Sequence, residues 1–244
     1  MAKSPPDGYT LLLTSTAEAL AKWLHRSTPF DVVNDFAPIA ELAEAPMLVL
    51  VDPALPVKSI GEFIAYAKAN PGKRGYGTPG VGTPHQLLGE ILKKVAGIDL
   101  VHVPYRGTAP SLNGLLAHQL PAIIATTIAV MPFIESGKVR ALATAGEERS
   151  SILPDVPTLA ESGFPQINVA SWFGLSAPAG TPTAIIERLN RDLRVVAETA
   201  DLRQRLAAQG FTIAVSSSND FKRAIAARYE KYGRIVAEIG LKSE

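Results

Sequence analysis

Short apolar segments alternate with amphipathic segments along most of this 244-residue chain. Apolar runs predict strands at residues 9–14, 46–52, 74–78, 100–105, 121–127 and 139–145. The segments between them have helical spacing and stop signals, and predict helices at residues 16–24, 59–70, 84–95 and 109–117. From Thr181 onward the chain reads mostly as helix, interrupted by residues 210–215. Such alternation predicts an α/β fold with largely parallel sheets.

Two extended segments rich in small residues or proline, 41–56 and 167–182, indicate where the chain crosses between two lobes. Residues 45–169 then form an inserted lobe, and residues 1–44 plus 170–244 form the other. A cleft between two lobes is where small ligands usually bind. The sequence therefore predicts a two-lobed protein with a ligand cleft between the lobes.

Composition removes several classes of function. The net charge is +1 with no basic block, so nucleic acid and anionic membranes gain little support as partners. The absence of cysteine excludes disulfides, thiolate metal sites and cysteine nucleophiles, and leaves the compartment open. The longest apolar run, residues 120–133, carries two threonines and is shorter than the ~20 residues of a membrane helix. We therefore expect no insertion into a membrane.

The glycine-rich stretch YGTPGVGTPHQLLGE, residues 76–90, is the most distinctive motif. Residues 75–80 spell the dinucleotide fingerprint G-x-G-x-x-G, but the predicted helix begins only at about Pro84, beyond the glycine pattern. The acidic residue expected after the next strand is also missing, since Asp99 precedes that strand. No lysine follows the glycines, which excludes a Walker loop. Nucleotide binding is therefore disfavoured.

What this loop does contain is a helix start. Thr83 at the N-cap, Pro84 at the first helical position and Gln86 at the third form a capping box. A helix N-terminus preceded by glycines favours an anion, because its amides point outward and carry partial positive charge. A well-capped helix with no ligand is the competing interpretation. His85, in the first turn, is the histidine that we retain for a pocket, with a capping or solvent-facing role equally open.

Similar small polar junctions end other predicted strands, at residues 14–18, 106–110 and 126–127. If these junctions face one crevice, their amides and hydroxyls suit a carboxylate held by neutral dipoles. Arg106 either pairs with such a carboxylate or lies on the surface.

Catalytic and metal motifs are absent from the sequence. It contains no G-x-S-x-G elbow, no H-E-x-x-H and no tight carboxylate cluster. Its four histidines lack metal-ligand spacing, and His102 alternates with valines on a strand, which favours a structural role. We therefore expect no enzyme, no catalytic residue, no metal and no cofactor.

Six blocks along the chain carry a family resemblance: PPDGYTLLLTS, YGTPGVGTPHQLLGE, VHVPYRGTAPSLNGLLA, ESGKVRALAT, LPDVPTLAESGFP and WFGLSAPAGTPTAIIERLN. Together they resemble the Bug-type substrate-binding proteins of tripartite tricarboxylate transporters. This resemblance implies a periplasmic, two-lobed protein that closes on a small carboxylate. It also implies delivery of that ligand to membrane permease subunits, without catalysis.

The resemblance also implies ligand-binding positions. In the first lobe they fall on Thr14, Ser15 and Thr16, and in the second lobe on Thr78, Gly80, Gly82, Thr83, His85, Arg106, Gly107 and Thr108. The glycine-loop amides, that of Gly82 included, are expected to point into the cleft. Family members often carry an acidic residue after the strand that matches AIIAT. Here Thr126 and Thr127 occupy this place, which favours a ligand without an amine.

The front of the chain departs from the family pattern. Family members begin with a signal peptide, a strand, a glycine-rich loop, a helix and a second strand, whereas this sequence starts after them. A natural truncation, a misassigned start and an excerpt all fit. The chain made alone is accordingly expected to be poorly soluble or to self-associate, and to bind carboxylates weakly at best. The alternative functions are a truncated ligand-sensing or interaction module and, third, an enzyme of unknown type.

Overall fold

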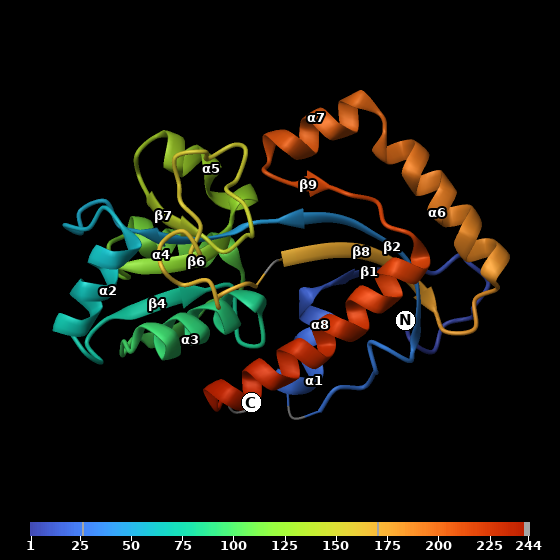
Figure 1. The fold of residues 1–244 in the computed structure, drawn as a ribbon, viewed down its shortest axis with the longest axis horizontal. Coiled ribbons are helices and arrows are strands. Elements are labelled where there is room, and N and C mark those ends of the chain that lie inside the picture. The colour runs from blue at the N-terminus through green and yellow to red at the C-terminus, as the bar shows by residue number, and fades with distance from the viewer. Residues whose placement is uncertain (26, 170, 242–244) are drawn as a thin grey trace. The chain divides into compact units, whose positions relative to one another are not determined.

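The computed structural model describes residues 1–25, 27–169 and 171–241, which divide into two compact units (Figure 1). Unit 1 comprises Met1–Glu44 and Ser171–Glu244, and unit 2 comprises Ala45–Ala170. The chain enters unit 2 across Pro46, between strands β2 (Phe36–Ala45) and β3 (Met47–Val51). The second expected crossing point, Ala170, lies outside the described residues.

Unit 2 contains a five-stranded sheet in the order β5-β4-β6-β3-β7. Strand β4 (Gly75–Thr78) pairs in parallel with β5 (Val101–Pro104) and β6 (Ala122–Thr126). Strand β3 runs antiparallel to both β6 and β7 (Arg140–Thr144). Four of these strands therefore share one direction, as expected. Strand β3, which follows β2 of unit 1 in the chain, is the one antiparallel strand among the described residues of this sheet and lies between β6 and β7.

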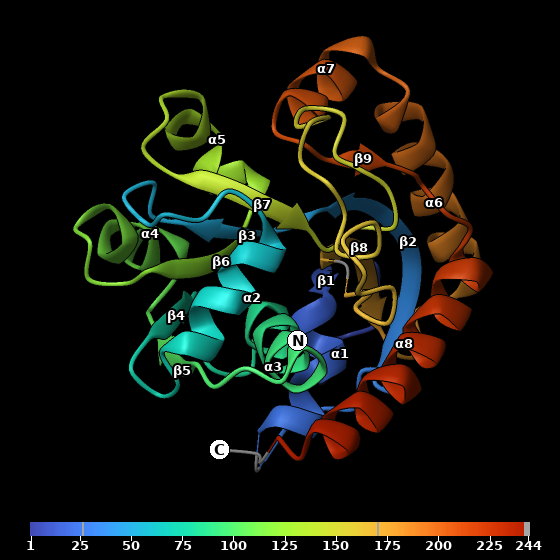
Figure 2. The ribbon, with the colours of Figure 1, turned by 60° about the vertical axis from the view of Figure 1, so that its left-hand side comes forward.

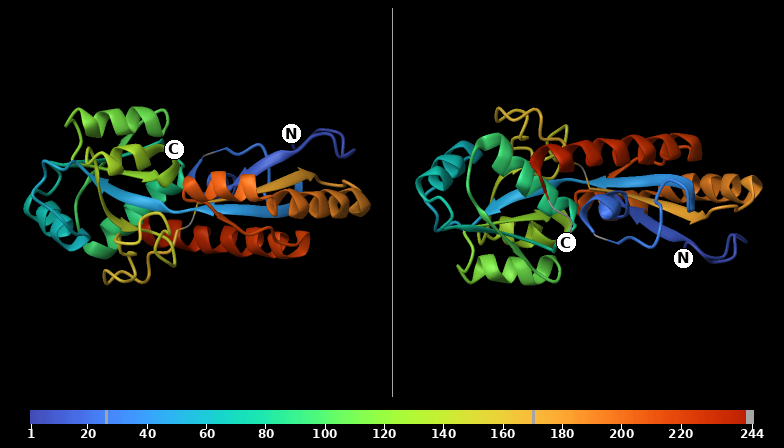
Figure 3. Two further views of the ribbon diagram at one scale, coloured as in Figure 1. Left: turned by 90° about the horizontal axis from the view of Figure 1, so that it is seen from above. Right: turned by 90° about the horizontal axis from the view of Figure 1, so that it is seen from below.

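Helices cover both faces of the unit 2 sheet (Figure 3). Helices α4 (Thr108–Leu116) and α5 (Thr127–Glu135) share one hydrophobic cluster with β3 and β6, in which Leu112, Val130 and Ile123 are buried. Helix α3 (Pro84–Ala96) packs on the opposite face through Gly89, which lies against the ring of Tyr76. Helix α2 (Ile60–Ala69) connects β3 to β4. Unit 2 thus has the layered α/β fold that the alternation of strands and helices predicts.

Unit 1 contains a sheet in the order β1-β8-β2-β9, with β1 at Leu12–Ser15, β8 at Ser171–Pro178 and β9 at Thr212–Ile213. The pairs β1–β8 and β2–β9 are antiparallel, so the expectation of a largely parallel sheet is wrong for these pairs. A parallel neighbour requires a crossover connection. β8 instead returns directly from unit 2 and runs against β1. The strand expected at residues 9–14 begins only at Leu12, because Asp7 Oδ1 accepts the Tyr9 amide in a turn.

Helices α1 (Thr16–Leu24), α6 (Thr183–Ala197), α7 (Ala200–Ala208) and α8 (Ser218–Ile239) complete unit 1 (Figure 2). Alternate residues of β8 face different helices: Trp172 stacks edge-on against Phe221 of α8, whereas Ala177 packs with Ile186 of α6. Helix α1 packs against α8, where Trp23 Nε1 donates to the Tyr229 carbonyl. Across the described residues, no helix combines the length and the apolar character that crossing a bilayer requires.

Candidate functional site

The carboxyl ends of β4, β5 and β6 lie at one edge of the unit 2 sheet, because these strands are parallel neighbours. A helix follows each strand: α3 after β4, α4 after β5 and α5 after β6. The topology therefore brings together at this edge the predicted residues Thr78, Gly80, Gly82, Thr83, His85, Arg106, Gly107, Thr108, Thr126 and Thr127. In α/β sheets, ligands bind outside the carboxyl ends of the strands.

The glycine-rich loop at this edge is bonded mainly to itself. The Gly80 amide donates to Thr78 Oγ1 at 3.3 Å, and Thr83 Oγ1 donates to the Gly80 carbonyl at 2.8 Å. The Gly82 amide donates to Gln86 Oε1 at 2.7 Å. Thr83 is the N-cap of α3 as predicted, but Gln86 accepts from Gly82 rather than from the cap itself. The Gly82 amide is thus satisfied within the unit and is not available to a ligand, contrary to expectation.

His85 lies in the first turn of α3 with only 9% of its surface exposed. Neither ring nitrogen has a hydrogen-bond partner among the described residues. Burial lowers the pKa of its imidazole to about 4, so the ring is neutral at neutral pH and offers one N–H donor and one acceptor. Buried polar groups are normally hydrogen-bonded. His85 is therefore a predicted site residue whose two ring nitrogens are buried and still able to form hydrogen bonds with a ligand.

Helices α4 and α5 begin at the same edge without a side-chain cap. The N-cap of α4 is Gly107, at a φ of 114°, whose own amide donates to the Pro79 carbonyl at 2.8 Å. The N-cap of α5 is Thr126, which makes no side-chain capping bond. No acidic residue occupies the first turn of α3, α4 or α5, although carboxylates are favoured there. These helix starts therefore present partial positive charge without an internal counter-charge.

The remaining residues at this edge differ in exposure. Arg106 is exposed and precedes α4, and Thr126 is half-buried at the end of β6. Thr127 is buried, and its amide donates to the Pro46 carbonyl at 3.4 Å. Thr78 is fully buried, with Oγ1 2.7 Å from His102 Nε2. No sequence pattern signals this contact between Thr78 and His102, since it depends on the β4–β5 register.

In unit 1 the predicted residues lie at the junction of β1 and α1. Thr14 Oγ1 donates to Ser176 Oγ at 2.7 Å, and Thr16 Oγ1 accepts the Trp172 amide at 3.0 Å. Ser15 and Glu18 form the predicted capping box of α1. These three hydroxyls therefore hold β1, β8 and α1 together.

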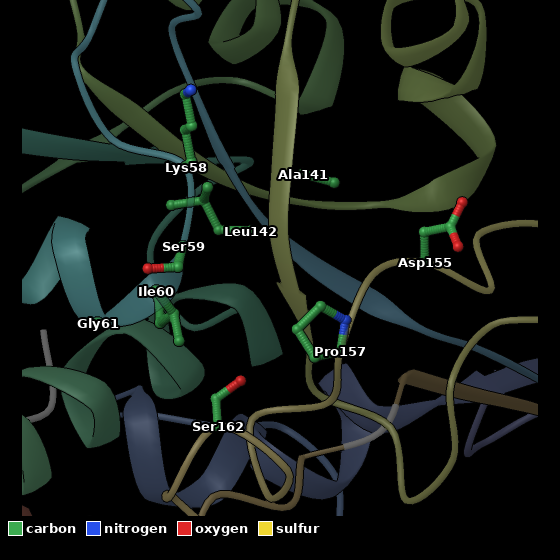
Figure 4. Close-up of a pocket in the computed structure, with 9 residues that line it drawn as sticks. All are labelled: Lys58, Ser59, Ile60, Gly61, Ala141, Leu142, Asp155, Pro157 and Ser162. Atoms are coloured by element: carbon green, nitrogen blue, oxygen red, sulfur yellow. The ribbon is translucent and has the colours of Figure 1, made fainter.

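A pocket of about 350 Å³ lies elsewhere in unit 2, between the start of α2, strand β7 and the loop that follows it (Figure 4). None of the predicted residues lines it. Two of its hydroxyls are already bonded, since Ser59 Oγ caps the Glu62 amide and Ser162 Oγ donates to the Thr158 carbonyl. Over the described part of the chain, no group of three or more His, Cys, Asp or Glu residues has a metal-binding arrangement.

Known proteins resemble this chain over almost its whole length. Protein BugT from Bordetella pertussis is 34% identical over 243 residues, which cover 99% of this chain and 74% of BugT. The solved structure of R. palustris Rpa4515 with adipate has a TM-score of 0.93 and 31% identity, covering 100% of this chain and 82% of that one. MatC from Rhodopseudomonas palustris, with bound malate, has a TM-score of 0.86 and 28% identity, covering 96% and 81% of the two chains.

The family described as "Tripartite tricarboxylate transporter family receptor" matches residues 1–241. Its members are receptors that bind solutes, which confirms the expectation of a protein that is not an enzyme. The close match to solved periplasmic binding proteins confirms the expectation of a two-lobed periplasmic-binding-protein fold. The chain therefore belongs to the tripartite tricarboxylate transporter receptor family.

Proposed function

We propose that this protein captures a small carboxylate between its two units and delivers it, in the periplasm, to the membrane permease subunits of a tripartite tricarboxylate-type transporter. The observation that carries the proposal is the carboxyl edge of the unit 2 sheet. Three helices start there without an acidic first turn, beside the unpartnered imidazole of His85. The relatives solved with adipate and malate add support, because both ligands are dicarboxylates.

Three kinds of group at this edge suit a carboxylate: helix-start amides, the His85 imidazole and the Arg106 guanidinium. The first-turn amides of α4, and those of α5 after Thr127, donate to a carboxylate oxygen. The neutral His85 imidazole donates its N–H without adding a formal charge. Arg106, which is exposed at the start of α4, supplies the positive charge. Hydrogen bonds to a charged group contribute about 1.5–3 kcal/mol each, so the loss of a single donor at this edge should lower the affinity measurably.

Thr126 and Thr127 narrow the ligand class. An acidic side chain at the end of β6 would pair with a ligand ammonium and repel a second carboxylate. Threonine at both positions removes that pairing and that repulsion. The preferred ligand is therefore a carboxylate without an amine. The family resemblance assigns the contacts on its other side to Thr14, Ser15 and Thr16 of unit 1, where the hydroxyls of Thr14 and Thr16 are buried and bonded within the unit.

Calorimetric titration of the purified chain with adipate, malate and free arginine tests this function. Binding of a dicarboxylate but not of arginine is expected. Replacing His85 with phenylalanine keeps an aromatic ring in place but removes its donor, and should weaken binding roughly tenfold or more. Arg106→Ala should also weaken it, whereas Arg149→Ala is the matched control, since Arg149 already pairs with Glu161.

Two results would contradict the proposal. One is the absence of binding to every member of a panel of aliphatic and aromatic carboxylates, which would favour an interaction module. The other is tight binding that neither His85→Phe nor Arg106→Ala alters, which would place the site elsewhere.

A further inference from the structure

His102 connects two residues of the neighbouring strand. It lies on β5, opposite Tyr76 in the parallel β4–β5 register. Its ring packs on the Tyr76 ring, with centroids 5.2 Å apart, and its Nε2 lies 2.7 Å from Thr78 Oγ1. The imidazole thus spans Tyr76 and Thr78, which alternate onto the same face of β4 as α3.

The Thr78 hydroxyl passes this contact on to the glycine-rich loop. Its oxygen accepts the Gly80 amide at 3.3 Å and lies 3.2 Å from the Gly80 carbonyl. A hydroxyl has one proton and two lone pairs, so it serves His102 and Gly80 together in either tautomer of the imidazole. If Nε2 accepts, Thr78 donates to it. If Nε2 carries the proton, Thr78 turns its own proton to the Gly80 carbonyl.

The loop is therefore anchored at both ends. Thr78 is held by His102 at the strand end, and Gly82 is held by Gln86 at the helix end. Between these anchors the Pro79 carbonyl accepts the Gly107 amide at 2.8 Å, which joins the loop to the N-cap of α4. Contacts along the loop therefore link Thr78 to the start of α4.

We propose that His102 is a positioning residue for ligand capture: through Thr78 it fixes the Thr78–Thr83 loop and, through Pro79, the start of α4. The ligand-binding part of this inference rests on the proposed function. The structural part does not, because the hydrogen bonds it invokes all lie within the unliganded unit. Sequence alternation alone assigns His102 only a place on a strand face.

Three substitutions at this position separate hydrogen bonding from ring packing. His102→Phe retains an aromatic ring against Tyr76 but removes both nitrogens. His102→Gln places an amide nitrogen or oxygen at the distance of Nε2, and His102→Asn places one at the distance of Nδ1. We expect roughly tenfold weaker adipate binding for the phenylalanine and asparagine variants, with near-normal binding for the glutamine variant. The Gly80 amide should show a shifted NMR resonance and faster hydrogen exchange in the two weakened variants only.

Two outcomes would overturn the proposal. Unchanged Gly80 exchange and adipate affinity in His102→Phe would show that the imidazole nitrogens are dispensable. Equal losses in His102→Phe and His102→Gln would show that ring packing, not the hydrogen bond, is responsible. If the unmodified chain binds no adipate, that result counts against the proposed function for this ligand, and Gly80 exchange still decides the role of His102. Should His102→Phe fail to fold, Thr78→Val removes the same bond, with Thr78→Ser as its control.

Discussion

Gly89 of α3 lies directly against the phenol ring of Tyr76 on β4. A Cβ atom at Gly89 would be 2.2 Å from the ring, far inside van der Waals contact. The phenol is fixed in turn, because its hydroxyl donates to Glu90 Oε1 at 2.7 Å. Glycine in the middle of a helix is costly in conformational entropy. Here that cost permits the close approach of α3 to the sheet that carries the glycine-rich loop.

Gly89→Ala should therefore destabilise the protein by about 1–3 kcal/mol, since the added methyl overpacks a buried and bonded ring. Gly61→Ala is the matched control, because it also lies in a helix and its Cβ would meet only the Ser59 hydroxyl at 3.9 Å. The control should be neutral or stabilising by up to about 1 kcal/mol. Urea unfolding measures both. Equal effects of the two substitutions would show that Tyr76 can move aside.

Arg228 joins α8 to strand β2. Its guanidinium donates to Glu41 Oε2 at 2.8 Å and Glu44 Oε1 at 3.0 Å, and lies 5.1 Å from the centre of the Trp172 ring. Removing it leaves the mostly buried Glu41 carboxylate without this partner, so Arg228→Ala should destabilise unit 1 by about 2 kcal/mol. Arg223→Ala on the same helix should have a much smaller effect, because its pair with Asp220 is exposed. Comparable midpoints for the two variants in urea would contradict this account.

Local signals predicted some elements well. The Ser15–Glu18 capping box and the apolar spacing after it define α1, and the structure begins and ends that helix at Thr16 and Leu24. Thr83 and Pro84 mark the start of α3 in the same way. The bounds of these helices depend on residues that are close in sequence, so they can be predicted from one amino-acid sequence.

Strand β2 and the contacts of the site depend on residues far apart in sequence. The charges of Glu41 and Glu44 obscure the strand pattern, and their partner Arg228 is more than 180 positions away. The contact between Thr78 and His102 follows from the pairing of β4 with β5. The polar junctions that follow β4, β5 and β6 could be identified from the sequence. Which of their amides remain unbonded could not be predicted from it. The Gly82 amide shows this, because only the folded loop reveals its bond to Gln86.

His85 should make the stability of the protein depend on pH. Burial lowers its pKa from 6.5 to about 4 in the folded chain, whereas the unfolded chain keeps a pKa near 6.5. Between pH 6.5 and pH 4, His85 is therefore mostly protonated in the unfolded chain and mostly neutral in the folded chain. Stability is retained above that pH and falls as the pH drops toward 4, by about 2 kcal/mol at pH 5 from this residue. His85→Gln should lack this component, which unfolding at pH 7.5 and pH 5 would reveal as a smaller difference than in the parent chain.

Strand β1 stands at the end of the unit 1 sheet, bonded to β8 on one side. Leu13 on this strand is 57% exposed, and Tyr9, which precedes the strand, is 92% exposed. Residues 8–17 carry no charge and no proline, so this edge lacks the usual protection against pairing with another chain. Leu13→Lys should reduce concentration-dependent self-association in sedimentation velocity runs while leaving the thermal midpoint nearly unchanged. Val195→Lys is the control, because Val195 is an apolar residue on α6 that is 68% exposed. An equal reduction by both substitutions would assign the effect to net charge rather than to the β1 edge.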